Sequence, residues 1–361
     1  MSSGRRVEPG TICDRNDLKW AHPGLVDYYY VDGRHTVDKF TNPAKTLEER
    51  RAKRDKMYRD IGAGRPAVLE AFAEFGETKT YTIPGCPEEP EAEVKVEVRF
   101  PKKLRRKMPV VFYIAGGAFL LGTPWLGPVE EYSQVFNAIV VAPWYRTGLD
   151  APYPAAVNDL HAAYAWMVEN ADELHVNPDK VVITGLSAGA ALSLSLAFRL
   201  KRYGFKPRGA VAVDPICDER SNYLSHTYVN DALDSEQIHQ FMMEYLGPLN
   251  FGSSSLGPEA MAGRATVEDC RGLCPIVIHA AENDVDRDAS NAFTQKLYAA
   301  GVYTEYHVWG GCCHATLFNS SKEDNPFRER FEAVVNGNIS DLLKYDMRRE
   351  WLTENEGGDA A

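Results

Sequence analysis

A serine stands between two glycines at residues 185–189, in the order Gly-x-Ser-x-Gly. The apolar run 181–184 precedes this motif, and a run with helical character, 190–200, follows it. A serine on the tight turn between a buried strand and a helix sits at the edge of a sheet, and the N-terminal amides of the helix point at it. The motif predicts that Ser187 is a nucleophile for acyl transfer; the alternative is a tight turn whose serine caps the helix.

A serine hydroxyl is a weak nucleophile until a base takes its proton, and histidine is the usual base. Among the nine histidines, His279 and His307 fall inside predicted strands, where a packing role is expected. His314 instead follows the predicted strand 303–309 and a pair of glycines. A loop of that kind can place an imidazole over the sheet edge, so we predict that His314 is the base.

The histidine needs an acid that fixes its tautomer and stabilises its protonated form. Asp284 follows the predicted strand 276–281 by three positions. Asp286 is a close alternative and Glu282 a more remote one, whereas Asp288 fits better as the N-cap of the next predicted helix. We predict Asp284 as the acid.

Acyl transfer also needs N–H donors for the negative oxygen that forms on the carbonyl carbon. Two adjacent glycines, Gly116 and Gly117, directly follow the predicted strand 109–115. Glycine lets the backbone approach a substrate without a Cβ in the way. The sequence thus predicts an oxyanion hole from the amides of Gly117, Ala118 and Ala188, with Gly116 as a further member.

Strand-like and helix-like segments that could position these residues alternate from about residue 76 onward, which is typical of a mostly parallel sheet with helices on both sides. The first two predicted strands alternate in polarity like an antiparallel pair, and the others are short apolar runs. The eight predicted strands are 78–83, 94–100, 109–115, 138–143, 180–185, 209–214, 275–281 and 303–309, and the clearest helices are 157–173, 289–300 and 327–343.

About 60 residues between Asp214 and Pro275 interrupt this alternation, where a connection between strand and helix normally needs far fewer. An insertion at the carboxyl ends of parallel strands lies where such sheets bind ligands, which favours a cap. The predicted division is an N-terminal segment that contributes to the cap (1–75), a first core part (76–216), the cap insertion (217–270) and a second core part (271–361).

Composition excludes several other classes of protein. The formal net charge is −11, from 40 Lys and Arg against 51 Asp and Glu. A surface this acidic repels nucleic acids and anionic membranes. No apolar run is long enough to span a bilayer and no apolar core of a signal peptide is visible, so a cytoplasmic location is expected. The seven cysteines form neither a disulfide framework nor two zinc-ligand pairs, so we expect reduced thiols and no metal.

From about residue 76 onward, the chain resembles the bacterial hormone-sensitive-lipase-like esterases, which have the α/β-hydrolase fold. The loop 115–119 stands where that family carries HGGGF, and 145–146 with 153–159 match its YRLAPE and PAAVxD segments. Residues 284–288 match its DPLRD segment, and the separation between the predicted acid and base also agrees. This agreement favours Asp284 over Asp286.

The chain departs from the family pattern at a few positions. Ala115 replaces the histidine of the glycine loop, and Ala118 replaces its third glycine. Leu186 and Ala190 replace an aspartate and a glycine of the serine motif. None of these changes removes a group that the chemistry requires.

The resemblance implies a serine carboxylesterase with a helical cap that hydrolyses small-molecule esters of short to medium chain and needs no cofactor. It leaves a homodimer open. Two alternatives remain: the same triad acting on an amide, formamide, carbamate or lactone, and a non-catalytic receptor that binds small ligands. The aromatic residues expected to line an apolar substrate pocket are Phe119, Trp125, Tyr223, Phe241 and Tyr245.

Overall fold

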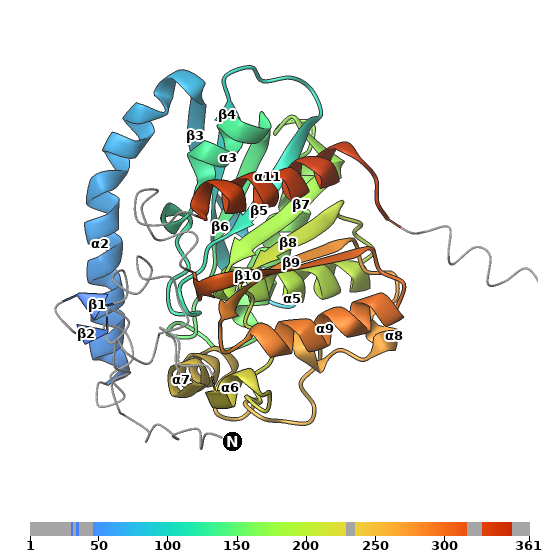
Figure 1. The fold of residues 1–361 in the computed structure, drawn as a ribbon. Helices are drawn as coiled ribbons and strands as arrows, with labels where there is room; N and C mark the ends of the chain where they lie inside the picture. Colours follow the sequence, from blue (N-terminus) through green and yellow to red (C-terminus); the bar gives the residue numbers. More distant parts are fainter. Residues whose placement is uncertain (1–29, 32–33, 36–45, 229–234, 316–326, 349–361) are drawn as a thin grey trace, which may run out of the picture.

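A computed structural model describes residues 30–31, 34–35, 46–228, 235–315 and 327–348 of the chain. Its centre is an eight-stranded sheet in the order β10-β9-β8-β7-β5-β6-β4-β3 (Figure 1). The strands are β3 (Gly76–Pro84), β4 (Glu93–Pro101), β5 (Met108–Ile114), β6 (Ile139–Trp144), β7 (Val176–Leu186), β8 (Gly209–Val213), β9 (Ile276–Asn283) and β10 (Thr304–Cys313). A separate ribbon pairs β1 (Tyr30–Val31) with β2 (Arg34–His35). The predicted fold class is confirmed.

The direction of the strands determines where a site can form. β4 runs antiparallel to both β3 and β6, while the strands from β6 through β5, β7, β8 and β9 to β10 are all parallel to one another. The central parallel strands are buried on both faces, which explains their continuous Val- and Ile-rich sequences. Their carboxyl ends meet at one edge of the sheet, where ligands bind in open sheets of this kind.

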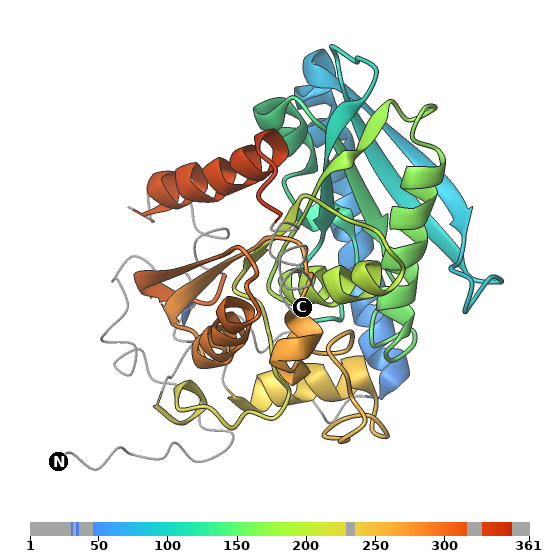
Figure 2. The same cartoon turned by 90° about the vertical axis from the view of Figure 1, so that its right-hand side faces the viewer.

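Helices cover both faces of the sheet and form two apolar cores. Leu160, Leu192 and Phe293 belong to the core on one face, and Val129 and Phe331 belong to the core on the other. Figure 2 shows α11 on one side of β9 and β10, with α9 on the other. The helices are α2 (Leu47–Ala71), α3 (Val129–Phe136), α4 (Ala155–Glu169), α5 (Ala188–Arg202), α6 (Ser225–Tyr228), α7 (Ser235–Leu246), α8 (Val267–Cys270), α9 (Arg287–Ala299) and α11 (Arg328–Lys344), with short 3₁₀ turns at Ala73–Phe75, Pro124–Leu126 and Ala262–Arg264.

Helix α2 runs along one flank of the molecule, from the end that holds α7 to the start of β3 (Figure 1). Near its start, Arg50 forms an ion pair with Glu244 of α7. Further along, Arg65 forms ion pairs with Glu97 of β4 and Glu130 of α3. The helix therefore connects the insertion to the core. Most of residues 1–45, for which the sequence predicts a role in the cap, lie outside the described residues.

The main correction to the predicted elements concerns the last strand. The prediction ends it at Trp309, but β10 continues to Cys313 through a bulge in its pairing with β9. Gly311 adopts a positive φ of 72° within this bulge, and its N–H donates to the carboxylate of Glu282. His314 therefore follows a strand directly, and its position is fixed by the sheet.

Within the described residues, no helix combines the length and apolar character that crossing a bilayer requires.

Candidate active site

Ser187 occupies the sharp turn between β7 and α5. Its φ of 56° and ψ of −122° are unusual for a residue with a side chain, and such strain is typical of functional turns. The turn leaves room only for glycine at the positions two before and two after the serine. A Cβ on Gly185 would lie 2.5 Å from the backbone of Gly189, and one on Gly189 would lie 2.2 Å from the carbonyl oxygen of Ile114.

The three predicted catalytic side chains meet at the carboxyl end of the sheet. The Oγ of Ser187 lies 2.8 Å from Nε2 of His314, which is 127 positions further along the chain. The Nδ1 of the same imidazole lies 2.8 Å from Oδ2 of Asp284. Because a carboxylate only accepts, Nδ1 carries the proton and Nε2 is free to accept from the serine hydroxyl. This is the arrangement that a proton relay from serine to histidine needs.

The alternative acids have other partners. The backbone N–H of Asp286 donates to Oδ1 of Asp284, and the carboxylate of Asp286 lies 3.7 Å from Nε2 of His226. Glu282 accepts from a backbone amide of β10. The expectation for Asp288 is wrong: Asp286 occupies the N-cap position of α9, while Asp288 accepts from the backbone N–H of Ser225 in α6.

The glycine loop lies beside the serine. A Cβ on Gly116 would lie 2.5 Å from the carbonyl oxygen of Leu186 and 3.7 Å from Cβ of Ser187, so the two turns are in contact. Gly117 and Ala118 have positive φ values of 127° and 56°. Among the described residues, the N–H groups of Gly117, Ala118 and Ala188 donate no hydrogen bond to a backbone carbonyl. Amide N–H groups that donate to no other acceptor and lie next to a nucleophile can stabilise a developing oxyanion.

Two tyrosines hold the glycine loop in place in this chain, which has Ala115 at the position of the family's histidine. The hydroxyl of Tyr145 lies 2.8 Å from the carbonyl oxygen of Ala115 and 3.0 Å from that of Leu121. The hydroxyl of Tyr58, in α2, accepts a hydrogen bond of 2.7 Å from the N–H of Gly122. Burial raises the pKa of both phenols, so both stay protonated at neutral pH. The substitution at Ala115 therefore leaves the loop anchored at both ends.

Asp214 is a further polar residue at the site that the sequence search did not single out. It follows β8 directly and is 1% exposed. Its Oδ1 accepts from the N–H of Ala281 at 2.8 Å, and its Oδ2 accepts from the N–H of Ala315 at 2.9 Å. The signal that could have found it is the one used for the acid, a carboxylate directly after an apolar strand.

The predicted substrate-binding aromatics have packing contacts in the structure. Phe119 stacks on Tyr245, with ring centroids 4.3 Å apart, and these two rings and Phe241 are buried in the core. The hydroxyl of Tyr223 donates to Asp218, and the indole N–H of Trp125 donates to Glu97. A role for these residues in substrate binding stays a prediction.

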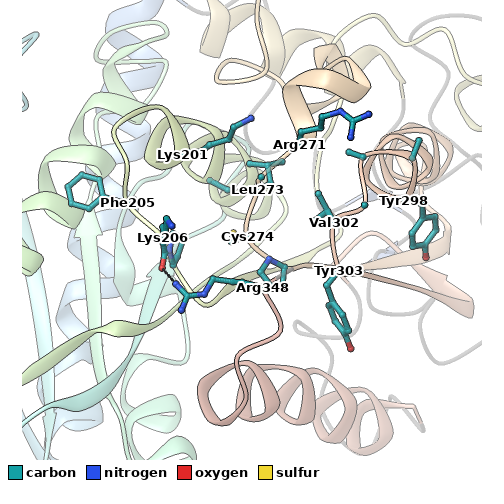
Figure 3. A pocket seen from close by; sticks show the side chains of 17 residues that line it. Lys201, Phe205, Lys206, Arg271, Leu273, Cys274, Tyr298, Val302, Tyr303 and Arg348 are labelled. Carbon is teal, nitrogen blue, oxygen red and sulfur yellow. Dashed lines mark hydrogen bonds between the residues drawn. The ribbon is translucent and has the colours of Figure 1, made fainter. Parts of the chain in front are cut away.

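One cavity of about 610 Å³ lies at the opposite end of the sheet (Figure 3). Lys206, Leu273 and Tyr303 line it, and they lie one to three residues before the first residues of β8, β9 and β10. Two of its cations already have partners: Arg271 pairs with Glu268 and Arg348 with Asp346. Because this cavity lies at the opposite end of the sheet, and neither the serine, the histidine nor the aspartate lines it, it is separate from the candidate active site.

Three side chains elsewhere could in principle hold a metal. Ligand atoms of Cys86, Glu88 and His161 lie within 4.8 Å of one another. However, the carboxylate of Glu88 already lies 3.6 Å from the guanidinium of Arg199 and 3.8 Å from that of Arg202. These positive charges oppose binding of a cation, and the absence of a metal stays a prediction. The six cysteines in the described part of the chain are buried free thiols.

Comparison with known proteins places this geometry in context. A family model described as "alpha/beta hydrolase fold" matches residues 111–318. Carboxylesterase NlhH of Mycobacterium tuberculosis is 34% identical over 219 residues, which cover 59% of this chain and 68% of that protein. Esterase LipI of the same organism is 29% identical over 236 residues, which cover 64% of this chain and 67% of that protein.

Solved structures of esterases have a fold similar to that of this chain. The structure titled "Bacterial Heroin Esterase" has a TM-score of 0.77 and 25% identity, and the match covers 91% of this chain and 99% of that one. Esterase LipW from Mycobacterium marinum has a TM-score of 0.72 and 23% identity, with 91% and 98% covered, and this likeness shows the fold alone.

Proposed function

Since the chain belongs to the hormone-sensitive-lipase-like family of the α/β-hydrolase fold, we propose that it is a serine carboxylesterase with Ser187 as nucleophile. The observation that carries this proposal is the continuous set of contacts from Ser187 Oγ through His314 to Asp284. The relatives named carboxylesterase and esterase support the same chemistry.

In the first half of the reaction, Nε2 of His314 takes the hydroxyl proton as Ser187 Oγ attacks the ester carbonyl carbon. The carbonyl oxygen becomes negative and accepts hydrogen bonds from the amides of Gly117, Ala118 and Ala188, with Gly116 packed against the serine turn. Loss of one such donor typically costs about 3–4 kcal/mol in the transition state. The imidazolium then gives its proton to the leaving alcohol, and the acyl group stays on the serine.

In the second half, His314 takes a proton from water, and the resulting hydroxide attacks the acyl-enzyme. The same amides stabilise the second oxyanion, and the histidine returns the proton to Ser187 as the acid leaves. Asp284 stabilises the positive imidazole in both halves and keeps the proton on Nδ1. No step requires a metal or an organic cofactor.

We also propose that the described residues of the insertion 217–270 and helix α2 of the N-terminal segment form a cap over this site. Two contacts support this assignment: Arg50 of α2 pairs with Glu244 of α7, and the backbone of Glu244 packs against Gly148, where a Cβ would lie 2.7 Å away. The domain division and the cytoplasmic location stay predictions from the sequence, which leaves a homodimer open.

A chain-length series of p-nitrophenyl esters tests the proposed function, together with the matched p-nitroanilides. We expect hydrolysis of the short and medium esters, with a kcat/KM well above that of the anilides, because an amide needs protonation of a poorer leaving group. Equal or faster turnover of the anilides would favour an amidase. A complete lack of turnover, with no covalent adduct from an organophosphate, would favour the receptor alternative.

A further inference from the structure

We propose that Asp214 is a positioning residue for the proposed triad, because its carboxylate ties together the two chain segments that carry Asp284 and His314. This inference rests on the proposed function. Asp214 itself need not touch the substrate.

Each carboxylate oxygen of Asp214 accepts a hydrogen bond from one of these two segments. Oδ1 accepts from Ala281, in the strand that ends just before the proposed acid, and Oδ2 accepts from Ala315, the residue directly after the proposed base. The backbone N–H of Asp214 also donates to the carbonyl oxygen of His279 at 2.7 Å. Through these three bonds, the end of β8 fixes the spacing between the end of β9 and the residue after His314.

Only a carboxylate satisfies both amides. An asparagine offers one oxygen acceptor, and its NH₂ group would face the N–H of the second segment. The site is fully buried, so an amide that loses its acceptor has no water to replace it and the loss carries a free-energy penalty. Ala315 also has a φ of 58°, a strained value that the bond to Asp214 helps to maintain.

The charge of Asp214 acts on the same groups. The titratable groups that face it are Asp284, His314 and Cys312. Burial, followed by repulsion from Asp284, raises the pKa of Asp214 to about 7, whereas His314 and the two amides favour its charged form. A negative charge here in turn favours the protonated form of His314.

The test compares wild type with Asp214→Asn in p-nitrophenyl ester hydrolysis across the pH range. We expect kcat to fall about 10- to 100-fold, because small misplacements of catalytic groups have effects of this size, while KM changes little. We also expect the acidic limb of the kcat/KM profile to move to lower pH, because the imidazolium loses a stabilising charge. The matched control is Asp159→Asn, which removes another buried carboxylate that accepts a backbone N–H, from Arg146; it should leave the acidic limb unchanged even if it lowers the melting temperature.

A second measurement covers the case in which Asp214→Asn folds poorly. In Asp214→Ser, which removes the charge with a smaller side chain, the downfield NMR resonance of the His314 Nδ1 proton should shift upfield or vanish. Wild-type kcat and an unmoved acidic limb in Asp214→Asn, or an unchanged resonance in Asp214→Ser, would overturn the inference. A wild-type enzyme without esterase activity would instead contradict the proposed function.

Discussion

The hydroxyl of Tyr58 accepts a hydrogen bond from the backbone N–H of Gly122, 64 residues further along the chain, at a distance of 2.7 Å. Tyr58 lies in α2, outside the part of the chain that the family model matches. Gly122 ends the loop that supplies the proposed oxyanion donors. The N-terminal helix is therefore bonded directly to the loop that the chemistry depends on.

This contact makes Tyr58→Phe an informative variant. Without the hydroxyl, the N–H of Gly122 loses its acceptor and the loop gains freedom, so we expect kcat to fall roughly 3- to 10-fold with little change in KM. Steady-state kinetics on one p-nitrophenyl ester measures both quantities. Tyr298→Phe, an exposed tyrosine at the other end of the sheet, is the control and should behave as wild type. A wild-type kcat in Tyr58→Phe would show that the loop does not need α2.

The ion pairs of Arg65 should contribute strongly to stability. Its side chain is 10% exposed and those of Glu97 and Glu130 are 4% exposed, so Arg65→Met leaves two buried carboxylates without their cation. Removing one partner of a buried pair typically lowers the free energy of unfolding by about 3–5 kcal/mol. The control is Lys56→Met, whose pair with Asp60 is exposed and should change stability by less than about 0.5 kcal/mol. Urea unfolding of both variants checks this, and similar small losses in the two would contradict it.

His279 should make the fold sensitive to acid. Its Nδ1 accepts from the indole N–H of Trp309, and its Nε2 pairs with Oδ1 of Asn338, so the ring is held in its neutral form. Burial lowers its pKa to about 3, whereas a histidine in the unfolded chain titrates near about 6.5. Between these values the unfolded chain binds a proton that the native state does not, so stability falls as the pH falls.

The expected loss from this one group is about 2 kcal/mol at roughly pH 5 compared with neutral pH. Denaturant unfolding of wild type and His279→Gln at roughly pH 7.5 and pH 5 measures the contribution of His279 to this loss of stability. Wild type should lose more stability between the two conditions than the variant, by about that amount. Parallel losses in both proteins would mean that His279 is protonated in the native state.

The acid assignment predicts opposite outcomes for two neighbouring aspartates. Asp284→Asn should lower kcat by about 10⁴-fold, because the amide favours the wrong histidine tautomer. Asp286→Asn should lower it less than about 10-fold, because the N–H that Asp286 donates to the proposed acid belongs to the backbone and is retained in this variant. Both are measured as kcat on the same ester, with circular dichroism to check folding. The reverse order of effects would reassign the acid to Asp286.

The sequence allows the three proposed catalytic residues to be found because each follows an apolar strand at the same sheet edge. Because parallel strands all have their carboxyl ends at that edge, residues that follow different strands lie close together there even when they are far apart in the sequence. Asp214 obeys the same rule, but the acid is expected after the strand that precedes the strand of the histidine, and Asp214 follows an earlier one.

Other features could not be read from the chain. A pair of glycines normally indicates a loop, and the bulge that extends β10 depends on Glu282 accepting from Gly311. Helical spacing is present in the sequence from about residue 43 to 75, but no residue of α2 is fully buried, so no strongly apolar face indicates which side meets the oxyanion loop. Tyr58 is therefore visible only once the tertiary contacts are known.

The kinetics of Ser187→Ala and His314→Ala, measured beside their melting temperatures, test whether these two side chains carry out the hydrolysis. We expect kcat to fall by about 10⁴- to 10⁶-fold in each variant while the melting temperature stays close to that of wild type. Near-native turnover by either folded variant would contradict it, because hydrolysis would then proceed without the hydroxyl or the base on which every step depends.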